Sequence, residues 1–248
     1  MVGFKKWLKL LVMVLLLTSV AVASAGCGEQ AAEPETGDDA IVEVETETAI
    51  EADTEVELMA LDEAILDNNL AAVEGLLDRG EDVNTRGLLN ITMLHLAANL
   101  GRLEIAELLI SRGANVHATS DPGNTPLHAA AHGDSPEIAQ LLLHNGADVN
   151  ATDDQGFTPL HRGAVYGNTD TMKLLIENGA GVDLTDHAGS TPLHIAASRG
   201  NTEAVEILLE KGATINTADN AGNTPLNLSV TRGHEETASL LREHGGIK

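Results

Sequence analysis

Histidine is the residue type in this chain best suited to metal binding or acid–base chemistry, because its pKa lies nearest to neutral pH. The 248-residue sequence contains ten histidines, and four of them recur every 33 residues, namely His95, His128, His161 and His194. Ligands of one metal ion must converge on one point, whereas these histidines occupy the same position of successive segments. The spacing therefore does not support a metal site in the row.

Other catalytic patterns in the sequence are incomplete. His234-Glu235 begins like the helix of a zinc protease, but Ala238 stands where the second histidine is needed. The chain has no Gly-x-Ser-x-Gly turn, and its only cysteine has no histidine partner in such a motif. We therefore expect that the protein has no enzymatic activity, binds no metal or cofactor and takes no small-molecule substrate. An enzyme that used surface carboxylates and histidines would require a cleft with perturbed pKa values, which the pattern does not indicate.

The elements that position the histidines repeat with the same period of 33 residues. Threonines begin the units at 92, 125, 158, 191 and 224. Glycines recur with the same period at 80, 113, 146, 179, 212 and 245. Thr125-Pro126 predicts an N-cap and first helical residue, because proline lacks only an N–H that would be unpaired there. Leu141-Leu142 predicts the buried stripe of a second helix, and Gly146 its left-handed end. Each unit is therefore expected to be a helix pair.

Turn residues separate the units. Asp153-Asp154-Gln155-Gly156 and the equivalent segments at 186–189 and 219–222 predict hairpin fingers, with glycine supplying the positive φ. Asp134 stands where other units have glycine, with Gly133 displaced by one position. Because aspartate tolerates left-handed geometry, we expect only a local shift there.

These motifs resemble the ankyrin repeat. Thr-Pro-Leu-His is intact at 125–128, 158–161 and 191–194, and Gly146-Ala147-Asp148-Val149-Asn150 matches the family's turn. The resemblance implies an all-α ankyrin-repeat solenoid of six helix-turn-helix units with hairpin fingers, capped at both ends. It covers residues 58–248, with units near 59–91, 92–124, 125–157, 158–190, 191–223 and 224–248. In this family the motif histidines hydrogen-bond between units.

The N-terminal segment predicts export. Lys5, Lys6 and Lys9 precede an apolar run over residues 10–22, which ends in small residues and is too short to favour a permanent membrane span. Residues 1–26 are therefore expected to be a signal peptide. Cys27 follows Gly26, which resembles the lipobox of bacterial lipoproteins and implies an acylated cysteine that anchors the chain. Ala23-Ser24-Ala25 also suits ordinary cleavage after Ala25, which would release the protein instead.

Residues 27–57 predict an acidic, disordered tether. Residues 28–57 contain twelve acidic residues and no lysine, arginine or aromatic residue. The alternation in residues 41–45 also fits a strand, but the sequence shows no partner strand for it. The formal net charge of the chain is −24, so nucleic acid is not an expected partner. The charge either steers a partner with a basic surface or serves solubility alone.

A protein partner is expected to contact the concave side of the array, as in other ankyrin proteins. The aromatic residues Phe157 and Tyr166 lie in the central unit, and Arg162 replaces the smaller or aliphatic residues of other units. Interface hot spots favour such residues, and His132, His187, Asn124, Ser190 and Arg199 are candidates for the rim. Alternatively, Phe157 packs on its own finger and Arg162 extends its head into water.

The sequence therefore indicates a non-enzymatic, monomeric scaffold that binds a protein in the bacterial cell envelope. Its expected location is the membrane, through Cys27, facing the periplasm or the exterior. The alternative is a secreted effector or inhibitor that acts on a protein of another cell.

Overall fold

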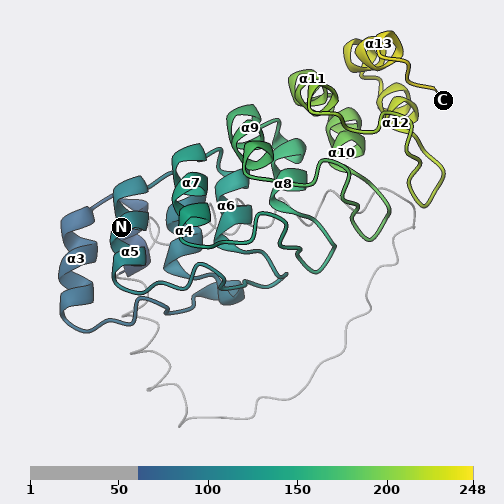
Figure 1. Ribbon diagram of the computed structural model, residues 1–248. Coiled ribbons are helices and arrows are strands. Elements are labelled where there is room, and N and C mark those ends of the chain that lie inside the picture. Colours follow the sequence, from purple (N-terminus) through teal and green to yellow (C-terminus); the bar gives the residue numbers. More distant parts are fainter. Residues whose placement is uncertain (1–60, 248) are drawn as a thin grey trace, which may run out of the picture. The chain divides into compact units, whose positions relative to one another are not determined.

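The computed structural model describes residues 61–247, and these form a stack of helix pairs (Figure 1). Residues 61–66 are helical and belong to the first pair. The bounded helices that follow are α3 (Leu70–Asp78), the short 3-10 helix η1 (Leu88–Asn90), α4 (Met93–Asn99), α5 (Leu103–Ser111), α6 (Pro126–His132), α7 (Pro136–His144), α8 (Pro159–Tyr166), α9 (Thr169–Glu177), α10 (Pro192–Arg199), α11 (Thr202–Glu210), α12 (Pro225–Arg232) and α13 (Glu235–Glu243). Within this described part no strand forms beyond one isolated bridge, between Arg86 and Thr92. The predicted all-α solenoid is confirmed.

The helices form two layers. The first helices of the units, α4, α6, α8, α10 and α12, pack on one another in chain order. The second helices form the other layer, and these are α3, α5, α7, α9, α11 and α13. Leu127, Ala130 and Ala131 of α6 are fully buried between neighbouring units. Alanine at the contact lets helix axes approach closely, and each unit therefore completes the core of the next.

The turn after α6 requires glycine at position 133. A Cβ on Gly133 would lie 2.1 Å from the carbonyl oxygen of Asn99, so no larger residue fits against the end of α4. Asp134 takes the left-handed conformation, with φ of 49°, where Gly101, Gly167 and Gly200 have similar values. The Thr171 hydroxyl donates to the Asp134 carboxylate at 2.9 Å. The left-handed geometry expected of Asp134 is confirmed, and α7 begins in the same 33-residue register as α5 and α9, without a shift.

Fingers leave the stack between units and pair with one another. In the finger before α8, the backbone N–H of Asp153 donates to the carbonyl of Phe157, and Gly156 has a positive φ of 82°. The N–H of His187 in the next finger donates to the Gln155 carbonyl at 2.9 Å. These turns confirm the predicted fingers, and the backbone bond between them fixes their spacing.

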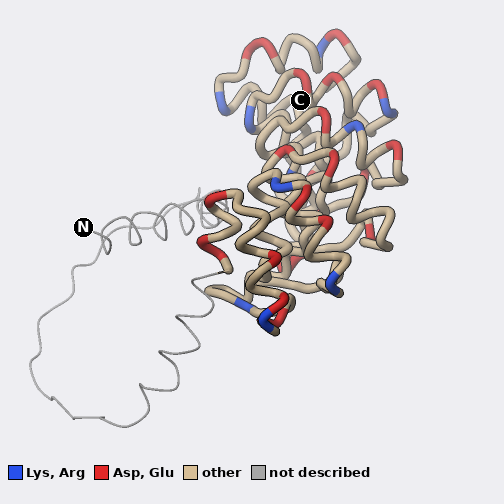
Figure 2. The backbone as a smooth tube through the Cα atoms, turned by 90° about the vertical axis from the view of Figure 1, so that its left-hand side faces the viewer, with Lys and Arg blue, Asp and Glu red and all other residues tan. Residues whose placement is uncertain are grey.

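The expected signal peptide, Cys27 and acidic tether all lie outside the described residues. Among the residues that the structure describes, no helix is long and apolar enough to span a membrane. Acidic positions outnumber basic ones along the array (Figure 2).

Candidate functional site

The motif histidines join each first helix to the finger that leads into the next unit. The backbone N–H of Thr125 lies 3.1 Å from His128 Nδ1, and because an N–H can only donate, Nδ1 is an acceptor. The proton is therefore on Nε2, which donates to the Phe157 carbonyl at 2.9 Å in the following finger. His95, His161 and His194 make the same bonds to the carbonyls of Asn124, Ser190 and Asn223. Each bond ends on the last residue of the histidine's own unit, directly before the threonine that begins the next unit, so the bonds expected between units lie within them instead.

Burial keeps these rings neutral. It lowers the pKa of His95 and of His128 from 6.5 to about 4, against the opposing effect of the hydrogen bonds to backbone carbonyls. The pKa values of His161 and His194 are lowered for the same reason. Both ring nitrogens of each histidine are already engaged, so none of the four is placed to act as a proton shuttle or metal ligand.

His234 also has a structural position. Its Nε2 lies 3.1 Å from the carbonyl oxygen of Ser198 at the end of α10. Asn168 and Asn201, at the equivalent positions of earlier units, donate to the ends of α6 and α8. Within residues 61–247 no group of three or more histidine, cysteine or acidic side chains is arranged to hold a metal ion.

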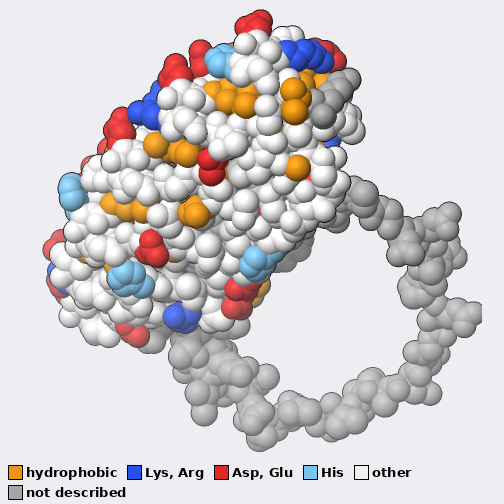
Figure 3. All heavy atoms as spheres, turned by 45° about the vertical axis from the view of Figure 1, so that its right-hand side comes forward, with side chains coloured by type: hydrophobic (Ala, Val, Ile, Leu, Met, Phe, Trp, Pro, Cys, Tyr) orange, Lys and Arg blue, Asp and Glu red, His pale blue; other side chains and the backbone are white. Residues whose placement is uncertain are grey.

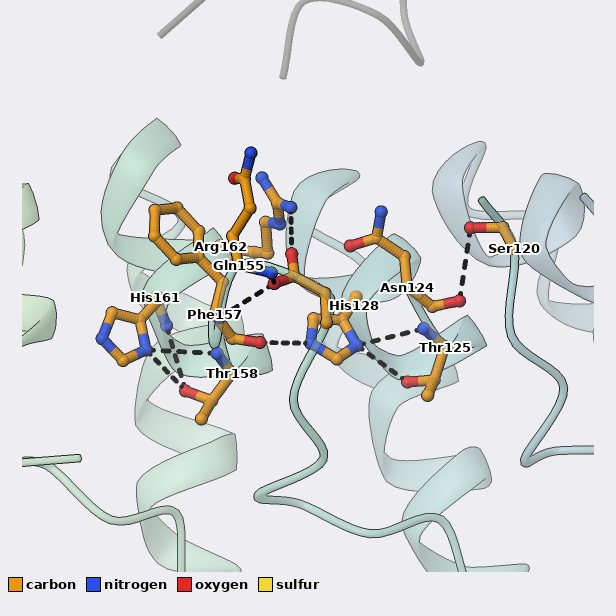
Figure 4. Close-up of polar contacts among 10 residues, drawn as sticks. Ser120, Asn124, Thr125, His128, Gln155, Phe157, Thr158, His161 and Arg162 are labelled. Atoms are coloured by element: carbon orange, nitrogen blue, oxygen red, sulfur yellow. Dashed lines mark hydrogen bonds and ion pairs between the residues drawn. The ribbon is translucent and has the colours of Figure 1, made fainter. Parts of the chain in front are cut away.

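Arg162 forms a buried ion pair under the central finger (Figure 4). Its Nη2 donates to Asp153 Oδ2, and the two residues are only 3% and 5% exposed. The other carboxylate oxygen of Asp153 accepts the backbone N–H groups of Gln155 and Phe157, at 2.8 and 2.9 Å. The guanidinium carbon lies 4.9 Å from the centre of the Phe157 ring, within the range of a cation–π contact. The ion pair therefore ties the finger to α8.

The position of Arg162 differs from the one expected of an interface arginine. Its head reaches neither a partner surface nor water, because Asp153 and the Phe157 ring enclose it. Phe157 is partly exposed, and its ring also stacks on His161 with the centroids 5.4 Å apart. Arg162 thus positions Phe157. Asp153, which the sequence assigned only to a turn, is the partner of Arg162 that sequence reasoning missed.

The remaining candidates form a second group at the other end of the first helices. Tyr166 is the last residue of α8 and is 36% exposed, and its ring centroid lies 4.3 Å from that of His132 on α6. Burial, and then the charge of Arg162, lower the pKa of His132 and favour its neutral form. Arg199, the last residue of α10, is exposed. We call His132, Tyr166 and Arg199 the helix-end group.

The six candidate residues therefore form two groups rather than one patch. Phe157, Arg162 and His187 lie on or beneath the fingers, and we call them the finger group. Phe157 lies two residues before α8 begins and Tyr166 is its last residue, so the two stand at opposite ends of that helix. Asn124 is partly exposed and Ser190 is buried. Only Phe157 and His187 of the finger group reach the surface.

The exposed surface is suited to contact with another chain. Figure 3 shows one face of the molecule, on which hydrophobic side chains appear only in small separate groups with charged residues and histidines between them. Aromatic rings with polar neighbours on a rigid stack can bury area against another chain at low entropic cost. Neither group combines a nucleophile with a base and an orienting residue.

Comparison with known proteins agrees with this architecture. The family model for ankyrin repeats (3 copies) matches residues 61–153, 94–186 and 160–248. No curated protein matches the chain. Ankyrin repeats indicate a scaffold for protein–protein interaction, and members of the family are typically non-enzymatic. The matched segments extend over most of the sequence, and the chain therefore belongs to the ankyrin-repeat family.

Proposed function

We propose that this protein is a non-enzymatic scaffold of the bacterial cell envelope, which binds one protein partner through the first helices and fingers of its central units. The observation that carries the proposal is the placement of the partly exposed Phe157 directly before α8 and of the exposed Tyr166 at the end of the same helix. They are the only aromatic residues of the array, and the buried Asp153–Arg162 pair holds the first of them in place.

The proposed location rests on the sequence before the array. A basic start, a short apolar run and a cysteine after small residues support export and acylation at Cys27. More than one acyl chain on that cysteine would hold the protein stably at a membrane. The acidic residues 28–57 would then separate the array from an anionic lipid surface, which repels them.

The alternative is a secreted effector or inhibitor. It is favoured by Ala23-Ser24-Ala25, which suits cleavage after Ala25 without acylation. The mass of the mature N-terminus separates the two functions, because an acylated Cys27 is heavier by its lipid and an N-terminal Gly26 indicates release.

Cross-linked capture from native envelope extract tests the scaffold function. The bait is the chain without residues 1–26, compared with a variant that carries Phe157→Ser, as in the equivalent Ser190, and Tyr166→Ala. The control variant is Leu184→Ala, which removes an apolar side chain of similar exposure, 41%, outside both groups. We expect the double variant to capture at least about tenfold less of one protein, because central aromatic residues carry most interface energy.

Equal capture by the wild type and the double variant would place the interface elsewhere on the array. If no protein is captured from the envelope by any of the three baits, the envelope scaffold is wrong and the secreted alternative becomes the better account. Circular dichroism of each bait confirms that the helical content is matched.

A further inference from the structure

Tyr166, Arg199 and Arg232 occupy the same position in three consecutive units. Each is the last residue of its first helix, α8, α10 or α12, and they are 33 residues apart. All three side chains are exposed. We call them the helix-end row, and it continues the helix-end group toward the C-terminal unit.

The two arginines of the row lack partners within the described part of the chain. Neither makes an ion pair or a hydrogen bond with a described residue, although the chain carries 38 acidic residues. The acidic residues that follow each of these helices contact bases of the second layer instead. Glu203 lies 4.0 Å from Lys173, and Glu235 lies 3.7 Å from Arg242. The two guanidinium groups are therefore available to another molecule.

The favourable interaction of a positive charge with a helix C-terminus explains only part of why arginine stands at these two positions. A positive charge at a helix C-terminus is favourable, so lysine would serve there as well as arginine. Arginine differs because its planar head can hold a carboxylate through two parallel hydrogen bonds. A tyrosine at the third position adds an aromatic surface, and its ring contacts the tilted ring of His132, with the centroids 4.3 Å apart.

The repeat geometry sets the spacing of a matching ligand. Equivalent residues of stacked helices are separated by the interaxial distance, about 8–10 Å. A peptide in the extended polyproline II conformation rises about 3.1 Å per residue with three residues per turn, so every third side chain lies on the same face and would meet the next position of the row. One extended segment can therefore place an apolar side chain on Tyr166 and carboxylates on Arg199 and Arg232.

We propose that the helix-end row binds an extended protein segment that carries an apolar residue followed by two acidic residues at intervals of three. The proposal deepens the proposed function, since it states what the partner presents to this part of the array. It also gives direction to the complex, with the acidic end of the segment over the C-terminal units.

An NMR titration tests this inference without the natural partner. The probe is a synthetic peptide with leucine, glutamate and glutamate at every third position, added at low salt to isotope-labelled chain lacking residues 1–26. We expect shifts confined to Tyr166, Arg199, Arg232 and their neighbours. The same peptide with glutamine in place of glutamate should bind at least about tenfold more weakly, because charge-assisted bonds are about twice as strong as neutral ones.

Three variants distinguish binding by the arginines of the row from a general effect of positive charge on the array. Arg199→Glu with Arg232→Glu should abolish the shifts, and Arg199→Lys with Arg232→Lys should weaken binding while keeping the charge at both helix ends. Lys211→Glu changes an exposed base in the second layer and should leave binding unchanged.

Shifts that are absent, or that persist in the double glutamate variant, would overturn the proposal. It would also be overturned if neutralising the acids of residues 28–57 moved the row's resonances as the peptide does, because the row would then hold the chain's own segment. The titration tests only the ligand of the helix-end row. The capture experiment tests the scaffold function separately, so the two proposals can fail independently.

Discussion

Replacing Asp153 with alanine is expected to lower the free energy of unfolding by about 3–5 kcal/mol, since it leaves the guanidinium of Arg162 buried without a counter-charge. The same change removes the acceptor for two backbone N–H groups of the finger. Urea unfolding followed by circular dichroism measures the loss. Because repeat arrays can unfold unit by unit, the shape of the transition must be checked for a single step before the energies are compared.

The next unit supplies the control for this prediction. There Asp186 is buried like Asp153 and accepts the N–H groups of Ala188 and Ser190, but Ile195 stands at the position of Arg162. Arg162→Ile therefore copies an arrangement that the fold already contains, and it should cost less than about 2 kcal/mol. The Nε of Arg162 is buried with no hydrogen-bond partner in the described chain, which further lowers the value of the pair. Equal losses from the two variants would contradict this account.

Acid is expected to destabilise the array before its carboxylates titrate. His95 and His128 have folded pKa values of about 4 and an unfolded value of 6.5, so below pH 6.5 the unfolded chain binds protons that the folded chain excludes. Their contribution to stability is complete above pH 6.5 and is lost as the pH falls toward 4. Each accounts for about 3 kcal/mol over that range, and the lowered pKa values of His161 and His194 act in the same direction.

Urea midpoints measured from pH 7 to pH 5 check this expectation, because aspartate and glutamate stay largely ionised in that interval. The variant His128→Asn is the control. It copies the last unit, in which Asn227 stands at the position of the histidine and its amide oxygen accepts the N–H and hydroxyl of Thr224. The variant should be less stable than the wild type at pH 7 and should lose less of its stability on acidification. A wild type whose midpoint is constant from pH 7 to pH 5 would show that the buried rings do not resist protonation.

Local chemistry in the sequence predicted most of the fold. Thr158-Pro159 gave the start of α8, and the observed N-cap is a threonine in an extended conformation with His161 completing a capping box. Asp134 was expected to tolerate left-handed geometry, and it does. Such features depend on a residue and its near neighbours, and the 33-residue period repeats them, so each prediction was supported several times within one chain.

The candidate site was harder to predict because it depends on contacts between elements. The sequence showed that Arg162 replaces aliphatic residues, but its partner Asp153 lies nine residues earlier in a segment already assigned to a turn. Only the fold shows that the finger bends back over α8. The same holds for Tyr166, which stands near Phe157 in the sequence and contacts His132 in the structure.

We propose contact between the partner and the layer of first helices. It is tested most directly by placing a photo-crosslinking residue at Tyr166, or at the exposed Glu206 on α11 in the other layer, in cells that express the whole chain. We expect one protein to be cross-linked to position 166 after illumination and to be absent from position 206. Cross-linking of that protein at position 206 alone would contradict it and place the interface on the second helices.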